Sequence, residues 1–143
     1  MKKYIFVVSL LCLLAACTGK RQGEAAAEVA ALPAVEDVVM YQVNPRVFAP
    51  EKSFKAVERR LDSIQTLGIN VVWFMPINEV GQEKSVNSPY CVKDYKGVNP
   101  EFGTLDEFKA LVATCHQKGM NVIIDWVANH TSWDNAWIAN KEW

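Results

Sequence analysis

The sequence predicts an α/β fold built on a parallel sheet. Three short apolar runs have the composition of strands, and a segment with helical periodicity follows each of the first two. The order strand, helix, strand, helix, strand is typical of parallel sheets with right-handed crossovers. Half of the 143 residues are hydrophobic, which favours one packed domain over a disordered chain.

The chain begins with a segment that we expect to direct export. A short basic head precedes an apolar run, Tyr4 to Leu14, that is too short to remain as a spanning helix. Leu14-Ala15-Ala16-Cys17 follows and resembles the lipobox of bacterial lipoproteins, whose cysteine is lipidated and becomes the first mature residue. The alternative is an ordinary signal peptide that is cut near Ala16.

This reading divides the chain into three parts. Residues 1–16 form a lipoprotein signal peptide, and residues 17–37 hold the lipidated Cys17 and a flexible tether rich in Ala, Gly and Glu. Residues 38–143 form the folded part. We therefore expect an exported lipoprotein anchored to a membrane, on either the periplasmic or the cell-surface face.

The folded part begins with a strand and a helix. Val38 to Val43 is a β-branched apolar run that stops at Asn44 and Pro45, as a buried strand would. We expect Ser53 to cap the first helix and Gly68 to end it. Its apolar stripe recurs at spacings of three and four: Phe54, Val57, Leu61, Ile64 and Leu67.

The pattern then repeats. Ile69 to Met75 is apolar almost throughout, which indicates a strand covered on both faces. Thr104 and Glu107 have capping-box spacing at the start of a second helix, which Gly119 ends, and Met120 to Ile124 is the third strand. The apolar stripe of the second helix is Leu105, Phe108, Leu111, Val112 and Cys115.

Charge, glycine and cysteine usage exclude several function classes. The formal net charge of −1 gives no reason to expect a nucleic-acid partner. The loop after the first strand has no glycine, so its backbone cannot approach a pyrophosphate as dinucleotide sites require. Cys91 and Cys115 are the cysteines of the folded part; their spacing favours two free thiols over a disulfide, although export would allow a bridge.

Polar and aromatic motifs collect where the predicted strands end. Tyr41 to Arg46 spans the end of the first strand, Ser88 to Tyr95 lies in the long loop after the second, and Asp125 to His130 follows the third. In parallel α/β proteins this edge of the sheet binds ligands, because a rigid base presents the loop residues there.

These motifs resemble the first part of α-amylase family glycosidases, the retaining (β/α)8-barrel enzymes. Asp125-Trp126-Val127-Ala128-Asn129-His130 is similar to the family's signature at the end of the third strand, and Asn99 to Thr104 to its stretch before the second helix. Tyr41-Gln42-Val43 with Arg46 is similar to its first strand. The resemblance implies a partial TIM barrel, with its first three strands and two helices, truncated at the start of the insertion after the third strand.

The resemblance also implies roles for individual residues. It places Tyr90 as an aromatic ring that stacks on the sugar in the cleaved subsite, and His130 as a donor to a hydroxyl of that sugar. It makes Asn129 a possible ligand of a structural calcium ion, and it implies no organic cofactor. Structural or substrate-positioning roles fall to Asp125, Arg46, Asp94 and Tyr95.

Two features bear on substrate binding beyond these roles. Cys91 departs from the family, whose members often have Asp or a bulky aromatic residue after the stacking Tyr. Four of the five tryptophans lie late in the chain, where they would pack the inserted subdomain or, alternatively, stack on glucan: Trp126, Trp133, Trp137 and Trp143.

We expect the catalytic carboxylates of the family's reaction to lie outside this sequence. Retaining hydrolysis needs a carboxylate nucleophile and a carboxylic acid roughly 5 Å apart, which the family takes from its fourth and fifth strands. The sequence stops at Trp143, so we expect no catalytic residue within it, and Asp125 is not a substitute. We expect a fragment that is unstable alone, because its open sheet edge and apolar helix faces lack partners.

Three functional readings follow. The first is the amino-terminal portion of an exported, lipid-anchored α-glucan hydrolase or transglycosylase whose cleft includes Tyr90 and His130. The second is a non-catalytic surface lipoprotein that binds α-glucans. A free-standing flavodoxin-like domain is disfavoured, because such sheets usually need five strands.

Overall fold

The computed structural model describes residues 31–140, and a three-stranded parallel sheet forms their centre. The strands are β1 (Met40–Val43), β2 (Val71–Phe74) and β5 (Asn121–Ile124), in the order β1-β2-β5. The registers align Gln42 with Trp73 and Trp73 with Ile123. The predicted parallel α/β arrangement is therefore confirmed for the described residues.

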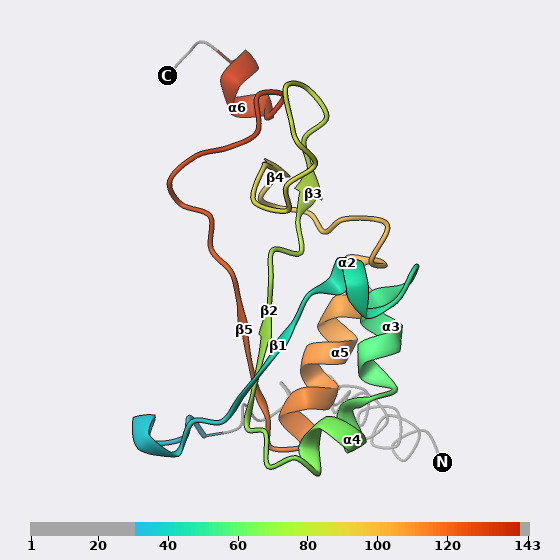
Figure 1. The fold of residues 1–143 in the computed structure, drawn as a ribbon, viewed down its shortest axis with the longest axis vertical. Coiled ribbons are helices and arrows are strands. Elements are labelled where there is room, and N and C mark those ends of the chain that lie inside the picture. The colour runs from blue at the N-terminus through green and yellow to red at the C-terminus, as the bar shows by residue number, and fades with distance from the viewer. Residues whose placement is uncertain (1–30, 141–143) are drawn as a thin grey trace, which may run out of the picture.

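Figure 1 shows that the helices next to the sheet lie on one side of it. They are α2 (Pro45–Phe48), α3 (Ser53–Glu58), α4 (Leu61–Gln65) and α5 (Leu105–Gln117). A two-stranded antiparallel hairpin, β3 (Glu79–Val80) and β4 (Val92–Asp94), extends beyond the carboxyl ends of the sheet strands, next to the short α6 (Ala136–Ala139). The long polar loop of the sequence is thus partly ordered as a hairpin.

The core lies between the sheet and these helices. Three aromatic rings form its centre: Phe108 lies 4.9 Å from Phe54 and 5.4 Å from Phe74, measured between ring centroids. Phe54 belongs to α3, Phe74 to β2 and Phe108 to α5, so this cluster joins both crossover connections to the central strand. Edge-to-face and tilted ring pairs of this kind add to the burial free energy.

The first crossover helix is not continuous as predicted. It divides into α3 and α4 around Arg59 and Arg60. Ser53 does not cap it, because Ser53 is its first residue and donates its hydroxyl proton to the Pro45 carbonyl oxygen at 2.5 Å. Leu67 is 66% exposed because α4 ends at Gln65, so the predicted stripe is wrong at that position. Gly68 does follow the segment with a left-handed backbone, φ 80°.

The second crossover helix has the predicted cap, although Leu105, the first residue of its predicted apolar stripe, is 42% exposed. The Thr104 side chain accepts from the Glu107 backbone N–H, and the Glu107 carboxylate accepts from the Thr104 N–H, which completes the capping box. Cys115 of this helix is buried, and this burial raises the pKa of its thiol to about 12. Cys91 and Cys115 are both free thiols, as their spacing favoured.

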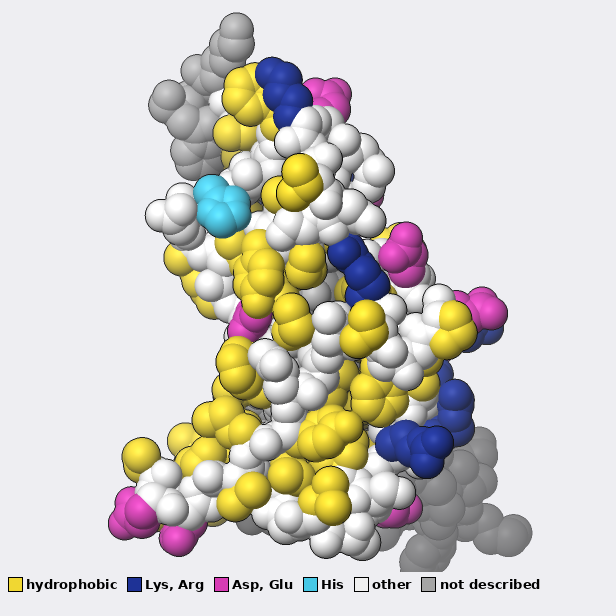
Figure 2. Space-filling view, viewed as in Figure 1, with side chains coloured by type: hydrophobic (Ala, Val, Ile, Leu, Met, Phe, Trp, Pro, Cys, Tyr) yellow, Lys and Arg dark blue, Asp and Glu magenta, His cyan; other side chains and the backbone are white. Residues whose placement is uncertain are grey.

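The opposite face of the sheet has no helix over it in the described residues. Met40 is 51% exposed and Ile123 is 42% exposed, and by register they lie on the same face as Trp73. Figure 2 shows hydrophobic side chains gathered over the strand region, with charged side chains mostly toward its margins. An apolar open face of this kind is the face that a closed barrel turns inward.

Several sequence predictions fall outside the described residues. The signal peptide, Cys17 and most of the expected tether lie in residues 1–30. The last part of that tether, residues 31–37, includes a 3-10 turn, η2 (Val35–Asp37), and the Ala31 carbonyl accepts from the Asn121 side chain. Between residues 31 and 140 no helix reaches the length and apolar character needed to cross a bilayer.

Leu111 is buried and Leu67 is exposed, although both belong to predicted apolar stripes, so their substitution should affect stability differently. Leu111→Ala should destabilise the fold by about 2–5 kcal/mol, because it opens a cavity in the core. Leu67→Ala should change stability by less than about 0.5 kcal/mol, because Leu67 is mostly exposed. The rate of cleavage by dilute thermolysin measures the difference, and equal rates for the two variants would contradict this account of the core.

Candidate functional site

The predicted site residues lie at and beyond the carboxyl ends of the parallel strands. Asp125 directly follows β5, and its backbone N–H donates to the Phe74 carbonyl oxygen at 2.9 Å. This hydrogen bond continues the ladder between β2 and β5 by one residue. The backbone of Asp125 is therefore fixed by the sheet and not by a loop.

Both oxygens of the Asp125 carboxylate have a partner. The Trp73 indole Nε1–H donates to Oδ1 at 2.6 Å, and the Tyr90 hydroxyl donates to Oδ2 at 3.0 Å. The hydrogen bond to Asp125, together with partial burial, raises the pKa of the Tyr90 phenol above its ordinary value of 10.0. Tyr90 itself is 39% exposed, so its ring remains accessible while its hydroxyl is held.

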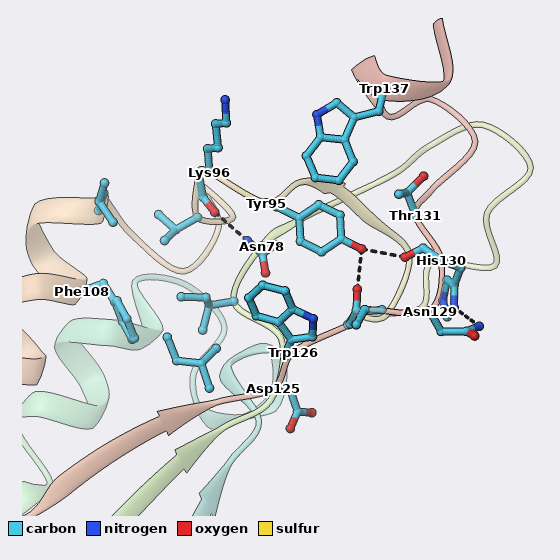
Figure 3. A pocket seen from close by; sticks show the side chains of 17 residues that line it. Asn78, Tyr95, Lys96, Phe108, Asp125, Trp126, Asn129, His130, Thr131 and Trp137 are labelled. Atoms are coloured by element: carbon cyan, nitrogen blue, oxygen red, sulfur yellow. Dashed lines mark hydrogen bonds between the residues drawn. The ribbon is translucent and has the colours of Figure 1, made fainter. Parts of the chain in front are cut away.

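Tyr95 ties the loop after β5 to the rest of the site. Its hydroxyl lies 2.7 Å from the Val127 carbonyl oxygen and 2.6 Å from that of His130, and it donates its one proton to this pair (Figure 3). Burial raises the pKa of Tyr95. The Tyr95 ring stacks on Trp137, with centroids 5.2 Å apart and an interplanar angle of 7°. Tyr95 thus has the loop-positioning contacts that the sequence suggested.

His130 and Asn129 lie together on that loop, and both are exposed. The Asn129 Nδ2 lies 3.3 Å from the His130 Nδ1. An amide nitrogen only donates, so in this pairing Nδ1 accepts, which requires the neutral imidazole tautomer with its proton on Nε2. Nε2–H is the group of His130 that can donate to a ligand hydroxyl.

Arg46 and Asp94 support the loops that carry these residues. Arg46 donates from Nη1 to the Asn87 carbonyl oxygen at 2.6 Å, which fixes the long loop three residues before Tyr90. Asp94 accepts from the Lys96 backbone N–H at 2.8 Å, which closes the turn after β4. Both contacts are structural, and each shapes a loop of the candidate site.

The segment after His130 packs closely on the hairpin. Ser132 donates its backbone N–H to the Val92 carbonyl oxygen at 2.9 Å. A Cβ placed on Gly81 would lie 2.2 Å from the Ser132 Cβ, so only glycine fits there. Asp134 accepts from the Gln82 backbone N–H at 3.0 Å, and this bond holds the pKa of its carboxyl below the usual range.

A groove of about 600 Å³ lies beside these loops, between the end of β5 and the start of α5. Figure 3 shows Trp126 beside this groove and the Asp125 side chain pointing away from it. Several of its polar groups are already engaged, since the Asn78 Nδ2 donates to the Asp94 and Gly97 carbonyl oxygens and Tyr95 holds the loop. The groove is therefore mainly an apolar flank of the sheet.

Three late tryptophans differ in their surroundings. Trp137 stacks on Tyr95, and Trp133 lies under the Lys84 ammonium at 3.8 Å from its ring centroid. Trp126 is 83% exposed at the groove. Two of the three thus contact other described residues, while Trp143 lies outside the described part.

The predicted calcium ligand Asn129 lies outside any cluster of acidic, histidine or cysteine side chains in the described residues. Calcium takes six to eight oxygen ligands. Within residues 31–140 no three His, Cys, Asp or Glu side chains come together as a metal site would require. Asn129 as a calcium ligand stays a prediction, and no step below depends on a metal.

Trp73 and Asn78 contribute to the site and were not predicted from the sequence, whereas Trp137 belongs to the late tryptophans that the sequence analysis singled out. The sequence could have pointed to Trp73, because an indole inside an aliphatic strand needs a hydrogen-bond partner for its N–H. Nothing in the sequence pointed to Asn78, because its contacts depend on loop conformation.

The comparison with protein families identifies the family to which this fold belongs. The family described as alpha amylase, catalytic domain, matches residues 51–142. The chain belongs to the alpha-amylase family. The sheet β1-β2-β5 accordingly matches part of the TIM barrel of this family.

Relatives and solved structures agree with this family membership. An oligo-1,6-glucosidase of Halalkalibacterium halodurans is 34% identical over 111 residues, which are 74% of this chain and 19% of that protein. The human amino acid transporter heavy chain SLC3A1 is 37% identical over 103 residues, 68% of this chain and 15% of that protein. The chain thus spans about a fifth of the length of the curated relatives it matches.

The solved structures include an alpha-amylase from Lactobacillus plantarum. It is 40% identical, with a TM-score of 0.68 over 72% of this chain and 25% of that chain. A maltogenic alpha-amylase from Thermotoga neapolitana is 33% identical, with a TM-score of 0.70 over 73% of this chain and 26% of that chain. Both likenesses extend to sequence as well as fold.

The hydrogen bonds of Tyr95 predict that this residue stabilises the loop after β5. Tyr95→Phe keeps the ring on Trp137 but leaves the two loop carbonyls without their donor, a loss of about 1 kcal/mol. Amide hydrogen exchange over residues 127–131 should therefore speed up severalfold, as mass spectrometry would measure. Tyr41→Phe in β1 is the matched control, and an equal effect from it would contradict the positioning role of Tyr95.

Proposed function

We propose that this chain contributes the amino-terminal part of a glycoside hydrolase that acts on α-linked glucans, with Tyr90 and His130 in its sugar-binding cleft. The observation that carries the proposal is the placement of Tyr90. Its hydroxyl is fixed on Asp125 at the strand ends, while its ring stays accessible. A flat aromatic ring held in this way orients a sugar through its apolar face.

We propose that His130, on the loop after β5 that also lines the groove, contributes to the same subsite. Its backbone is held by Tyr95, and its Nδ1 is engaged by Asn129. The remaining Nε2–H donates to a sugar hydroxyl, a contact that strengthens as oxocarbenium character develops at the anomeric carbon. The relatives named oligo-1,6-glucosidase and alpha-glucosidase support an α-glucoside as the substrate class.

The described residues bind and orient in this proposal but do not cleave. Retaining hydrolysis needs two carboxyl groups roughly 5 Å apart. At the carboxyl ends of β1, β2 and β5 the described residues offer one carboxylate, Asp125, and both of its oxygens are engaged. We propose that the nucleophile and the general acid of the enzyme belong to sequence other than these residues.

A second candidate is a non-catalytic protein that binds α-glucans. The match to an amino acid transporter heavy chain favours keeping it, because that relative is named for transport. Under this reading the same cleft binds sugar without hydrolysis. A lipid anchor at Cys17 on an exported chain is compatible with both candidates and is part of our proposal.

Sugar binding by the chain tests the proposed cleft. We expect isothermal titration to detect maltotriose, an α-linked trisaccharide, more strongly than its β-linked counterpart cellotriose. Tyr90→Ala should weaken maltotriose binding about threefold to tenfold, the usual value of an aromatic stack. Trp133→Ala is the control, since Trp133 is 56% exposed and its ring contacts the Lys84 ammonium. Equal binding of both sugars, or a loss confined to Trp133→Ala, would refute the cleft.

The lipid anchor has its own test. In a bacterial host, Cys17→Ser should move the protein from the detergent phase to the aqueous phase on detergent phase separation, because it removes the acylated thiol. Cys12→Ser is the matched control, since Cys12 lies inside the predicted signal peptide and should leave partitioning unchanged. A detergent-phase protein in both variants would rule out Cys17 as the anchor.

A further inference from the structure

Two side chains from separate segments donate hydrogen bonds to the carboxylate of a third residue, Asp125. Trp73 comes from β2, Asp125 follows β5, and Tyr90 comes from the loop before β4. The two hydrogen bonds use different oxygens of Asp125, Oδ1 for the indole and Oδ2 for the phenol. The carboxylate therefore links a residue of the sheet to a residue of a loop.

The sheet side of this link is rigid. Trp73 and Asp125 lie on adjacent parallel strands, with Trp73 paired with Ile123 and the Asp125 N–H bonded to the Phe74 carbonyl oxygen. A carboxylate on a fixed backbone can still rotate about its side-chain bonds. The indole N–H removes that freedom, because a charge-assisted hydrogen bond at 2.6 Å fixes the direction in which Oδ2 points.

Tyr90 lies on a loop, so its side chain is not fixed by the sheet and depends on the hydrogen bond to Asp125 for its position. The loop between β3 and β4 carries two non-glycine residues with left-handed backbones, Lys84 and Asn87, and its last residues lead to Tyr90. An accessible aromatic side chain on a loop has several rotamers, and restricting them on binding costs free energy. A hydroxyl anchored before the ligand arrives removes part of that cost.

We propose that Trp73 is a positioning residue, which orients the Asp125 carboxylate and through it presents the Tyr90 ring to an α-glucoside. The inference rests on the proposed function, because it assigns the reason for fixing Tyr90. Trp73 touches no ligand in this proposal. Its effect reaches the sugar through Asp125 and the Tyr90 hydroxyl alone.

The pKa of the Tyr90 phenol measures whether Trp73 and Asp125 hold its hydroxyl, and it can be followed without any ligand. Isotope-labelled tyrosine rings, followed by NMR against pH, give one titration for each of the four tyrosines, and Tyr90→Phe identifies that of Tyr90. Asp125→Asn should lower the Tyr90 pKa toward its ordinary value, because it removes the carboxylate that accepts the phenol proton. Trp73→Phe should lower it part of the way, because the unrestrained carboxylate leaves the phenol for part of the time. Trp133→Phe should leave it unchanged.

The second measurement asks whether the effects of Trp73 and Tyr90 substitutions on maltotriose binding are coupled. Trp73→Phe and Tyr90→Phe should each weaken binding about threefold to tenfold, and the double variant should bind no more weakly than either single variant. A Tyr90 titration unmoved by Trp73→Phe, or full additivity in the double variant, would overturn the proposal. If the titration shifts as expected but no variant, nor the parent chain, binds maltotriose, the link stands and the proposed sugar site fails.

Discussion

The central strand β2 is the constraint on which the described structure depends. It pairs with β1 on one edge and with β5 on the other, so it fixes the register of the whole sheet. Its side chains alternate between two environments. Phe74 enters the aromatic core with Phe108, while Trp73 faces the opposite side and reaches Asp125. One strand thus joins the packing that stabilises the fold to the hydrogen bonds that shape the site.

The helix ends that the sequence predicted correctly are those set by local rules. The capping box of Thr104 and Glu107 and the left-handed backbone of Gly68 depend on neighbouring residues only, and both are present. The burial of Ser53 and the exposure of Leu67 depend on where α2 and the end of α4 lie in space. Helical periodicity describes an ideal helix, so it could not locate the break at Arg59 and Arg60.

The same division applies to the candidate site. Strand order placed Asp125 at the edge of the sheet, and family resemblance singled out Tyr90 and His130. No sequence pattern brings Tyr90 and Asp125 together, because 35 residues and an irregular loop separate them. The contacts of Arg46 with Asn87 and of Tyr95 with the loop carbonyls likewise depend on loop geometry. The chemistry of the side chains identified the residues of the candidate site, and the tertiary structure determines which residues they contact.

The adjacent residues Asp125 and Trp126 show how strand alternation separates two surfaces. Because successive side chains point to opposite faces, Asp125 faces Trp73 while Trp126 lies at the groove beside α5. The groove offers aromatic area, but the Tyr95 hydroxyl and the Asn78 amide nitrogen beside it already bond to backbone carbonyls. A sugar needs hydrogen bonds at its rim as well as a flat ring, because its hydroxyls lose water on binding. The Tyr90 ring is anchored at the strand ends through its hydroxyl bond to Asp125 and is 39% exposed, whereas Trp126 is 83% exposed beside polar groups that are already engaged.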